Sequence, residues 1–180
     1  MHRLLLSFLI MMFSTMCASA AKLEISIKGE GSNGLVVIDL YEEVAPIHVK
    51  RMLALASNGS YDGVVFHRVI EGFMAQTGDV QFGKVGGNIA MAGRGASEMP
   101  DLPAEFSNIP YDRGIVGMAR SKNPNSANSQ FFIMFKKGHH LNSQYTVVGK
   151  VLVGMEFVDG LERGEPPASP DFMEKVRPQE

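Results

Sequence analysis

Arg68 is the first residue whose position suggests chemistry, because it interrupts an apolar run typical of a β-strand. Side chains alternate between the two faces of a strand, so the Arg68 guanidinium should lie on an apolar face. That face would carry Val64, Phe66 and Ile70. A charged group there fits the wall of a binding site. An arginine in a strand more often pairs with a surface carboxylate, however, and position alone leaves both interpretations open.

Gln130 raises a similar question at the start of the apolar run Gln130–Phe135. The same alternation places its amide beside Phe132 and Met134 on one face. A face that combines an amide with two large apolar groups is more typical of a pocket wall than of a core layer. A glutamine in a strand also commonly faces water, so this run by itself does not decide between a pocket and a surface.

Other motifs point away from several kinds of chemistry. The segment Gly83–Gly87 lacks the Gly-Lys-Ser/Thr ending of a phosphate-binding loop. His139 and His140 are adjacent, so they should diverge on a regular element, and no Cys or carboxylate stands at zinc-ligand spacing from them. The sequence also has no Gly-x-Ser-x-Gly nucleophile motif. We therefore predict neither a metal site nor a hydrolytic nucleophile.

The first elements along the chain are a predicted hairpin and a predicted helix. Leu23–Ile27 and Val36–Leu40 are rich in β-branched residues and are separated by a turn rich in glycine. Pro46 suits the first turn of a helix, and apolar residues then recur with helical spacing. Asn58 and Gly59 should end this helix.

Short apolar runs follow, separated by Gly, Asn, Pro and Ser clusters that are too short to contain crossover helices. This spacing favours antiparallel strands over βαβ units. With a second short helix over Met155–Leu161, the pattern predicts a mainly β protein. A closed barrel whose ends the two helices cover is favoured, since closure removes exposed strand edges. The predicted strands are Gly63–Ile70, Gly114–Met118, Gln130–Phe135, Tyr145–Val151 and Phe172–Val176.

Composition limits the classes of partner. The chain has 180 residues, with 17 Lys and Arg against 19 Asp and Glu, and its basic residues are scattered singly. This balance lacks the electrostatic footprint of a protein that binds nucleic acid or an anionic membrane surface. Hydrophobic residues make up 45% of the sequence, which is enough for one sizeable core and one domain.

Residues 1–20 have the pattern of a secretory signal peptide. A short basic start precedes the apolar run Leu4–Phe13, and Ala18–Ala20 forms a small-x-small cleavage site. The apolar run has about half the length that a membrane-spanning helix needs. We expect residues 1–20 to be removed, which also removes Cys17, the sole cysteine. Residues 21–180 would then form a single exported domain with no membrane anchor and no thiol nucleophile.

Four blocks of the sequence resemble the signature blocks of the cyclophilin family of peptidyl-prolyl cis-trans isomerases, in the family's order and spacing. The blocks are Phe66–Asp79, Gly114–Ala119, Asn128–Ile133 and Tyr145–Val151. The resemblance implies an eight-stranded antiparallel barrel capped by two helices, with a peptide site on its outer surface. It also implies an enzyme without a cofactor that accelerates rotation about X-Pro bonds in unfolded or partly folded proteins.

The resemblance further implies roles for individual residues. Arg68 matches the family's catalytic arginine. The apolar pocket for the proline ring is matched by Phe73, Met74, Phe132 and Leu141, the polar groups beside it by Gln76 and Gln130, and the lining of the substrate backbone by Ala119 and Arg120.

Two positions depart from the eukaryotic cytosolic members of the family. Tyr145 stands where those members have a histidine, and a tyrosine there is familiar in bacterial secreted members. Together with the signal peptide, this residue indicates a location in the bacterial periplasm. His140 stands where many of those members have a tryptophan, so we expect cyclosporin to bind only weakly. We expect a monomer that assists the folding of exported proteins.

Two other functions remain compatible with the sequence. One is a chaperone module that binds proline-containing peptides but has little isomerase turnover; the presence of Arg68, Phe73, Gln76 and Phe132 together argues against it. The other is a barrel that binds a small ligand in its lumen. That function would need a hollow interior, whereas Phe and Val side chains should fill an eight-stranded barrel.

Overall fold

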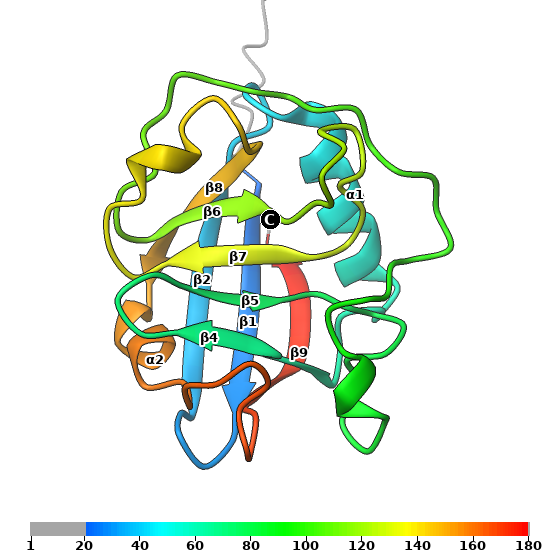
Figure 1. The fold of residues 1–180 in the computed structure, drawn as a ribbon, viewed down its shortest axis with the longest axis vertical. Coiled ribbons are helices and arrows are strands. Elements are labelled where there is room, and N and C mark those ends of the chain that lie inside the picture. The colour runs from blue at the N-terminus through cyan, green and yellow to red at the C-terminus, as the bar shows by residue number, and fades with distance from the viewer. Residues whose placement is uncertain (1–20, 180) are drawn as a thin grey trace, which may run out of the picture.

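The computed structural model describes residues 21–179, and within this range nine strands form one antiparallel sheet (Figure 1). The predicted signal peptide, residues 1–20, lies outside the described residues. The order of the strands in the sheet is β3-β9-β1-β2-β8-β6-β7-β5-β4. The strands are β1 (Lys22–Lys28), β2 (Gly34–Leu40), β3 (Val64–Val65), β4 (Arg68–Ile70), β5 (Met74–Thr77), β6 (Ile115–Met118), β7 (Phe131–Met134), β8 (Val147–Val153) and β9 (Phe172–Gln179).

The two ends of this sheet meet in one segment of chain. Strand β3 pairs with β9 and strand β4 pairs with β5, and only Phe66 and His67 lie between β3 and β4. The backbone N–H of Phe66 donates to the carbonyl of Asp171, 2.8 Å away, which extends the β3–β9 pairing toward β4. Counted as one interrupted strand, β3 and β4 give the eight-stranded antiparallel barrel predicted from the sequence.

The interruption changes which side chains share a face. Val64 and Phe66 point into the core and so does Val69, three residues after Phe66. The inward phase therefore shifts at His67, and Arg68 lies on the outside together with Ile70. The prediction that Arg68 shares a face with Ile70 is confirmed. The prediction that it shares one with Val64 and Phe66 was wrong, because strict alternation holds only within an unbroken strand.

Two α-helices accompany the barrel, as predicted. Helix α1 spans Pro46–Ser57, and the carboxylate of Glu105 accepts hydrogen bonds from the N–H groups of Ile47 and His48 at its N-terminus, at 3.1 and 3.0 Å. Helix α2 spans Met155–Asp159, two residues shorter at its end than predicted. Two 3₁₀ turns, η1 (Ile89–Met91) and η2 (His139–Leu141), lie in the loops. Among residues 21–179, no helix has the length and apolar character needed to cross a membrane.

The barrel interior is filled by inward side chains of the strands and by one face of α1. Tyr61 and Phe131 are fully buried and pack edge to face, with ring centroids 5.6 Å apart. Val49 and Met52 of α1 and Val158 of α2 join the same cluster. A core packed in this way argues against the alternative function of binding a ligand in the lumen.

Candidate functional site

A row of directly paired residues crosses four strands on the outer face of the barrel. Arg68 of β4 pairs with Gln76 of β5, Gln76 pairs with Phe132 of β7, and Phe132 pairs with Gly117 of β6. Directly opposed residues of antiparallel strands point to the same face, so the register alone brings an arginine, an amide and a phenyl ring together. Strands β4 to β7 form the near layer of the molecule in Figure 1.

A pocket of about 380 Å³ opens over this row. Ten of the eleven residues that the sequence predicted for the site line it. The exception, Gln130, lines an adjoining pocket of about 330 Å³ that shares Gln76, Ala119 and Arg120 with the first. We call these the main pocket and the adjoining pocket. The residues of the main pocket are Arg68, Phe73, Met74, Gln76, Ala119, Arg120, Phe132, His140, Leu141 and Tyr145.

Buried apolar side chains form the floor of the main pocket. Phe132 is 4% exposed, Met74 is 2% exposed and Leu141 is 8% exposed. The rings of Phe132 and Tyr145 pack edge to face, with a centroid distance of 5.8 Å and an interplanar angle of 84°. At the rim, Phe73 stacks on His140 with ring centroids 5.6 Å apart. This floor can take an apolar ring and exclude water from one side of it.

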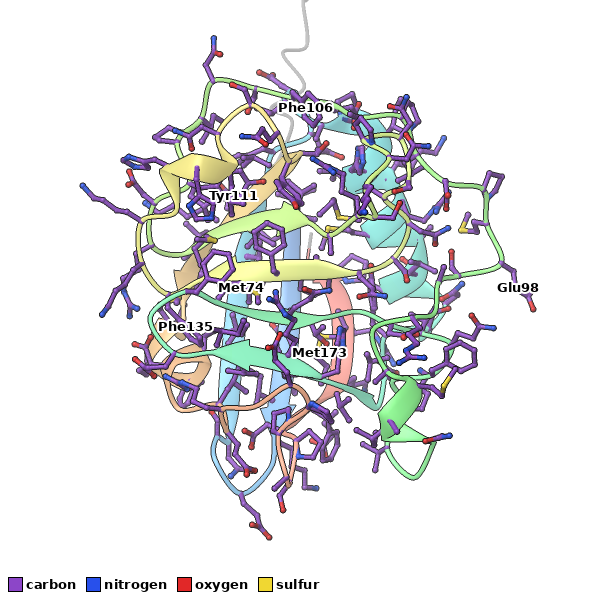
Figure 2. The ribbon with its side chains drawn as sticks, in the orientation of Figure 1. Met74, Glu98, Phe106, Tyr111, Phe135 and Met173 are labelled. Carbon is purple, nitrogen blue, oxygen red and sulfur yellow. The ribbon has the colours of Figure 1, made fainter. Side chains whose placement is uncertain are left out.

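Tyr111 packs against this floor and was not predicted from the sequence. Its ring stacks on Phe132 at 5.7 Å, and the side chain is fully buried in the cluster that contains Met74. The side chains of Tyr111 and Met74 are labelled in Figure 2. Burial raises the pKa of the Tyr111 phenol, so its hydroxyl stays protonated at neutral pH. Gly117 leaves room for this stack, since a Cβ there would lie 2.4 Å from the Tyr111 hydroxyl and 2.6 Å from Phe132 Cζ.

The Arg68 guanidinium lies at the edge of the main pocket between an acid and the apolar floor. Its Nε donates to a carboxylate oxygen of Glu165, and its Nη1 lies 3.9 Å from the sulfur of Met74. The Arg68 side chain is 37% exposed. Both interpretations of this residue are therefore realised together, because it pairs with a surface carboxylate and also lines a pocket.

Gln76 and Gln130 form a hydrogen-bonded pair that joins the two pockets. The Gln76 amide donates to the Gln130 carbonyl oxygen at 2.9 Å, and the Gln130 amide donates to the backbone carbonyls of Gly93 and Gly95 at 3.1 and 2.8 Å. The carboxylate of Asp79 holds the same loop by accepting from the N–H groups of both glycines, at 2.7 and 2.8 Å. These bonds fix the amide side of the main pocket.

Arg120 stands between the two pockets. Its guanidinium lies over the Tyr145 ring, 4.3 Å from the centroid. It donates to the carbonyl of Gln144 through Nε and Nη2, at 3.1 and 2.7 Å, and to the carbonyl of Ser121 through Nη1 at 2.9 Å. These contacts hold the Arg120 guanidinium in place over the Tyr145 ring.

The adjacent residues His139 and His140 contact different neighbours. The ring of His139 lies 3.1 Å from a carboxylate oxygen of Asp112, whereas the ring of His140 stacks on Phe73. Within residues 21–179, no cluster of three or more His, Cys, Asp or Glu side chains could hold a metal ion. The main pocket itself offers the hydrogen-bond donors of Arg68 beside an apolar floor.

Comparison with known proteins finds relatives among the peptidyl-prolyl cis-trans isomerases. A probable peptidyl-prolyl cis-trans isomerase of Brucella suis is 56% identical over 149 residues, covering 82% of this chain and 76% of the relative. The human peptidyl-prolyl cis-trans isomerase-like 3 is 39% identical over 130 residues, covering 72% and 77%. A cyclophilin-type isomerase structure from Cryptosporidium parvum has a TM-score of 0.75 and 25% identity, covering 90% of this chain and 99% of that one.

A second Cryptosporidium parvum structure, described as in the presence of the dipeptide Ala-Pro, has a TM-score of 0.74 and 27% identity, covering 88% of this chain and 99% of that one. The model of the family described as cyclophilin type peptidyl-prolyl cis-trans isomerase/CLD matches residues 22–178. The chain belongs to this family, and it is a peptidyl-prolyl cis-trans isomerase with the barrel fold and the proline-containing peptide substrates of the family.

Proposed function

We propose that Arg68 is the catalytic hydrogen-bond donor of this isomerase and that the floor of the main pocket holds the substrate proline ring. The observation that carries the proposal is the position of one guanidinium beside Phe132 and Met74 in a single pocket. An arginine has five N–H donors, and Glu165 engages only the one on Nε. The Nη donors therefore remain for the substrate.

The physics of the reaction explains why a hydrogen bond can be enough. Rotation about an X-Pro bond destroys amide resonance and meets a barrier of about 18–20 kcal/mol. In the twisted state the prolyl nitrogen becomes pyramidal and regains a lone pair that the planar amide lacks. A donor directed at that nitrogen is therefore bonded more strongly in the transition state than in the ground state, which is the condition for catalysis.

The energy required is modest. Uncatalysed isomerisation takes tens to hundreds of seconds, and shortening it to milliseconds needs about 5.5–7 kcal/mol of transition-state stabilisation. One preorganised hydrogen bond in a site of low water content contributes about 2.7–4 kcal/mol. Holding the ring against Phe132 and Leu141 while the carbonyl side rotates can supply the remainder, because it fixes one end of the rotating bond.

The remaining pocket residues receive roles in substrate binding. Gln76 and Gln130 offer amide groups beside the ring, and their mutual hydrogen bond keeps them in place. Ala119 and Arg120 line the passage from the main pocket to the adjoining pocket, where the substrate backbone would continue. Phe73, His140 and Tyr145 form the rim, and we expect the His140 imidazole to bind cyclosporin weakly.

Nuclear magnetic resonance with an Ala-Pro peptide tests this assignment. That peptide is a suitable probe because the similar Cryptosporidium parvum structure is described with the dipeptide Ala-Pro. The largest shifts of amide signals should fall on the strands under the main pocket, β4 to β7. Largest shifts around Leu35 and Leu152, which are exposed on β2 and β8, would contradict the assignment. Catalysed exchange between the peptide's cis and trans signals would separate isomerase turnover from chaperone-like binding alone.

We also propose that the enzyme is a monomer that acts in the bacterial periplasm on unfolded or partly folded exported proteins. The proposal is supported by the signal-peptide pattern of residues 1–20 and by Tyr145 at the rim of the pocket. Its test is expression of the full chain in a bacterium, followed by fractionation and N-terminal sequencing. A periplasmic protein beginning at Ala21 is expected, and a cytoplasmic protein with residues 1–20 intact would contradict the proposal.

A matched variant makes the export test specific. Leu9→Arg places a charge in the middle of the apolar run, so this variant should remain uncleaved in the cytoplasm.

The role in folding needs a separate measurement. Refolding of a denatured exported protein whose slow phase is prolyl isomerisation should accelerate when the enzyme is added. Size-exclusion chromatography of the mature chain should give the mass of a monomer.

A further inference from the structure

Glu165 lies beside Arg68 although 97 positions separate them in the sequence. Just before this residue the chain lies alongside β4, where Val69 and Gly164 form an isolated antiparallel bridge. Both backbone bonds of the bridge are made, from the N–H of Val69 to the carbonyl of Gly164 at 2.8 Å and in return at 2.9 Å. The bridge sets the backbone of Glu165 against the outer edge of β4, within reach of Arg68.

Further contacts hold the segment that carries Glu165. The neighbouring Arg163 donates through Nε to Glu71 at 2.7 Å and through Nη1 to the carbonyl of Asp159 at 2.8 Å, and its guanidinium lies over the Phe135 ring. Gly164 has φ of 154°, and a Cβ there would lie 2.5 Å from Pro167 Cα. The backbone just before Glu165 is therefore anchored by the contacts of Arg163 and Gly164.

Glu165 engages the Nε atom of Arg68, and this choice of atom determines which donors remain for the pocket. A carboxylate on Nε restricts rotation of the planar guanidinium about the last bonds of the side chain, and it leaves both Nη groups unoccupied by that bond. One of these groups, Nη1, lies against Met74 in the floor of the main pocket. An arginine tethered in this way presents its donors to the pocket before substrate arrives, which removes part of the entropic cost of the catalytic hydrogen bond.

We propose that Glu165 is a positioning residue that orients the Arg68 guanidinium for transition-state hydrogen bonding. The proposal rests on the role of Arg68 in the proposed function. Both side chains are partly exposed, at 37% for Arg68 and 53% for Glu165, so water screens the pair and the effect is that of a surface ion pair. We expect Glu165→Ala to lower kcat by about fivefold. KM should stay within about twofold, because Glu165 lies outside the pocket lining.

The experiment measures kcat and KM on an Ala-Pro peptide for Glu165→Ala, Arg68→Ala and the double variant. If Glu165 acts through Arg68, removing it from the Arg68→Ala enzyme should change nothing further. Glu71→Gln is the control, because it removes a carboxylate that pairs with Arg163 in the same segment but does not touch Arg68. The bonds of Arg163 to the Asp159 carbonyl and of Gly164 to Val69 still hold the segment in that variant, so it should retain wild-type kcat.

The outcomes separate this inference from the proposal on which it depends. Wild-type kcat in Arg68→Ala would refute the catalytic role of Arg68 itself. A large loss in Arg68→Ala with wild-type kcat in Glu165→Ala would refute only the positioning role. Equal losses from Glu165→Ala in the presence and absence of Arg68, or an equal loss in Glu71→Gln, would show that displacement of the segment is responsible, and would also refute the positioning role.

Discussion

Replacing Arg68 with alanine is the most direct test of how this enzyme works. The substitution removes the donor from the edge of the main pocket and leaves the apolar floor, including Phe132 and Met74, in place. It also removes the ion pair with Glu165. Because the variant keeps the other groups that the reaction needs, the change in rate measures the contribution of the guanidinium.

The expected size of the effect follows from the geometry. One preorganised donor contributes about 2.7–4 kcal/mol, which corresponds to a loss of about 10²- to 10³-fold in kcat/KM. The Arg68 side chain is 37% exposed, and this partial contact with water favours the lower end of that range. The lost ion pair should cost no more than about 1 kcal/mol of stability, so the melting temperature should fall by about 4 °C or less.

The assay couples isomerisation of an Ala-Pro peptide to a protease that cleaves only the trans form, and thermal unfolding monitors the fold. Arg113→Ala is a matched control, because Arg113 is 49% exposed and also pairs with an acid, Asp159, but lies outside both pockets. Its kcat/KM should stay within about twofold of wild type. A folded Arg68→Ala enzyme with wild-type kcat/KM would refute the mechanism, since the apolar floor alone would then account for the rate.

Two further predictions concern packing and pH. Gly117→Ala should lower kcat/KM by about tenfold or more, because the new Cβ would clash with Tyr111 and Phe132 and displace the floor. Unchanged turnover on the Ala-Pro peptide would show that the position of the Phe132 ring is not critical. Burial lowers the pKa of His48 and of His67, against the opposing effects of Glu105 and Asp79, so the unfolded chain binds more protons than the folded one below about pH 6.5. The free energy of unfolding in urea should therefore fall as the pH drops from 7 to 5, by at most about 1.4 kcal/mol per pH unit for each histidine, and a constant or rising value would contradict this account.

The elements predicted best are those whose residues carry a complete local pattern. The hairpin of β1 and β2, the helix from Pro46 and the strands β6 and β7 lie where the sequence placed them. Alternation along β7 also placed Phe132 and Met134 on one face correctly, because β7 is an unbroken strand. In each case the pattern and the final structure depend on the same few neighbouring residues.

Elements that depend on distant partners were not predictable in this way. Strand β5, Met74–Thr77, was not among the predicted strands, since the sequence Met-Ala-Gln-Thr has little β-branched character. It is a strand because β4 and β7 pair with it on either side. The shift of phase at His67 likewise follows from closure of the barrel, where the chain passes from pairing with β9 to pairing with β5.

The family resemblance predicted which residues form the site, and strand register explains why they lie together. Arg68, Gln76 and Phe132 are far apart in sequence, yet they are direct partners across adjacent strands. No local periodicity reports such pairing, because register depends on how the whole barrel closes. The resemblance to a known family carries that information implicitly, and all of the predicted residues therefore line the two adjoining pockets.

Tyr111 and Glu165 show what the resemblance did not supply. Both contact predicted residues from loops: the Tyr111 ring stacks on Phe132, and the Glu165 carboxylate accepts from Nε of Arg68. A strand position is constrained by pairing on two sides, whereas a loop reaches its target through a few contacts such as the bridge at Gly164. The placement of Arg68, Gln76 and Phe132 therefore follows from strand pairing, whereas the contacts of Tyr111 and Glu165 with them must be read from the three-dimensional structure.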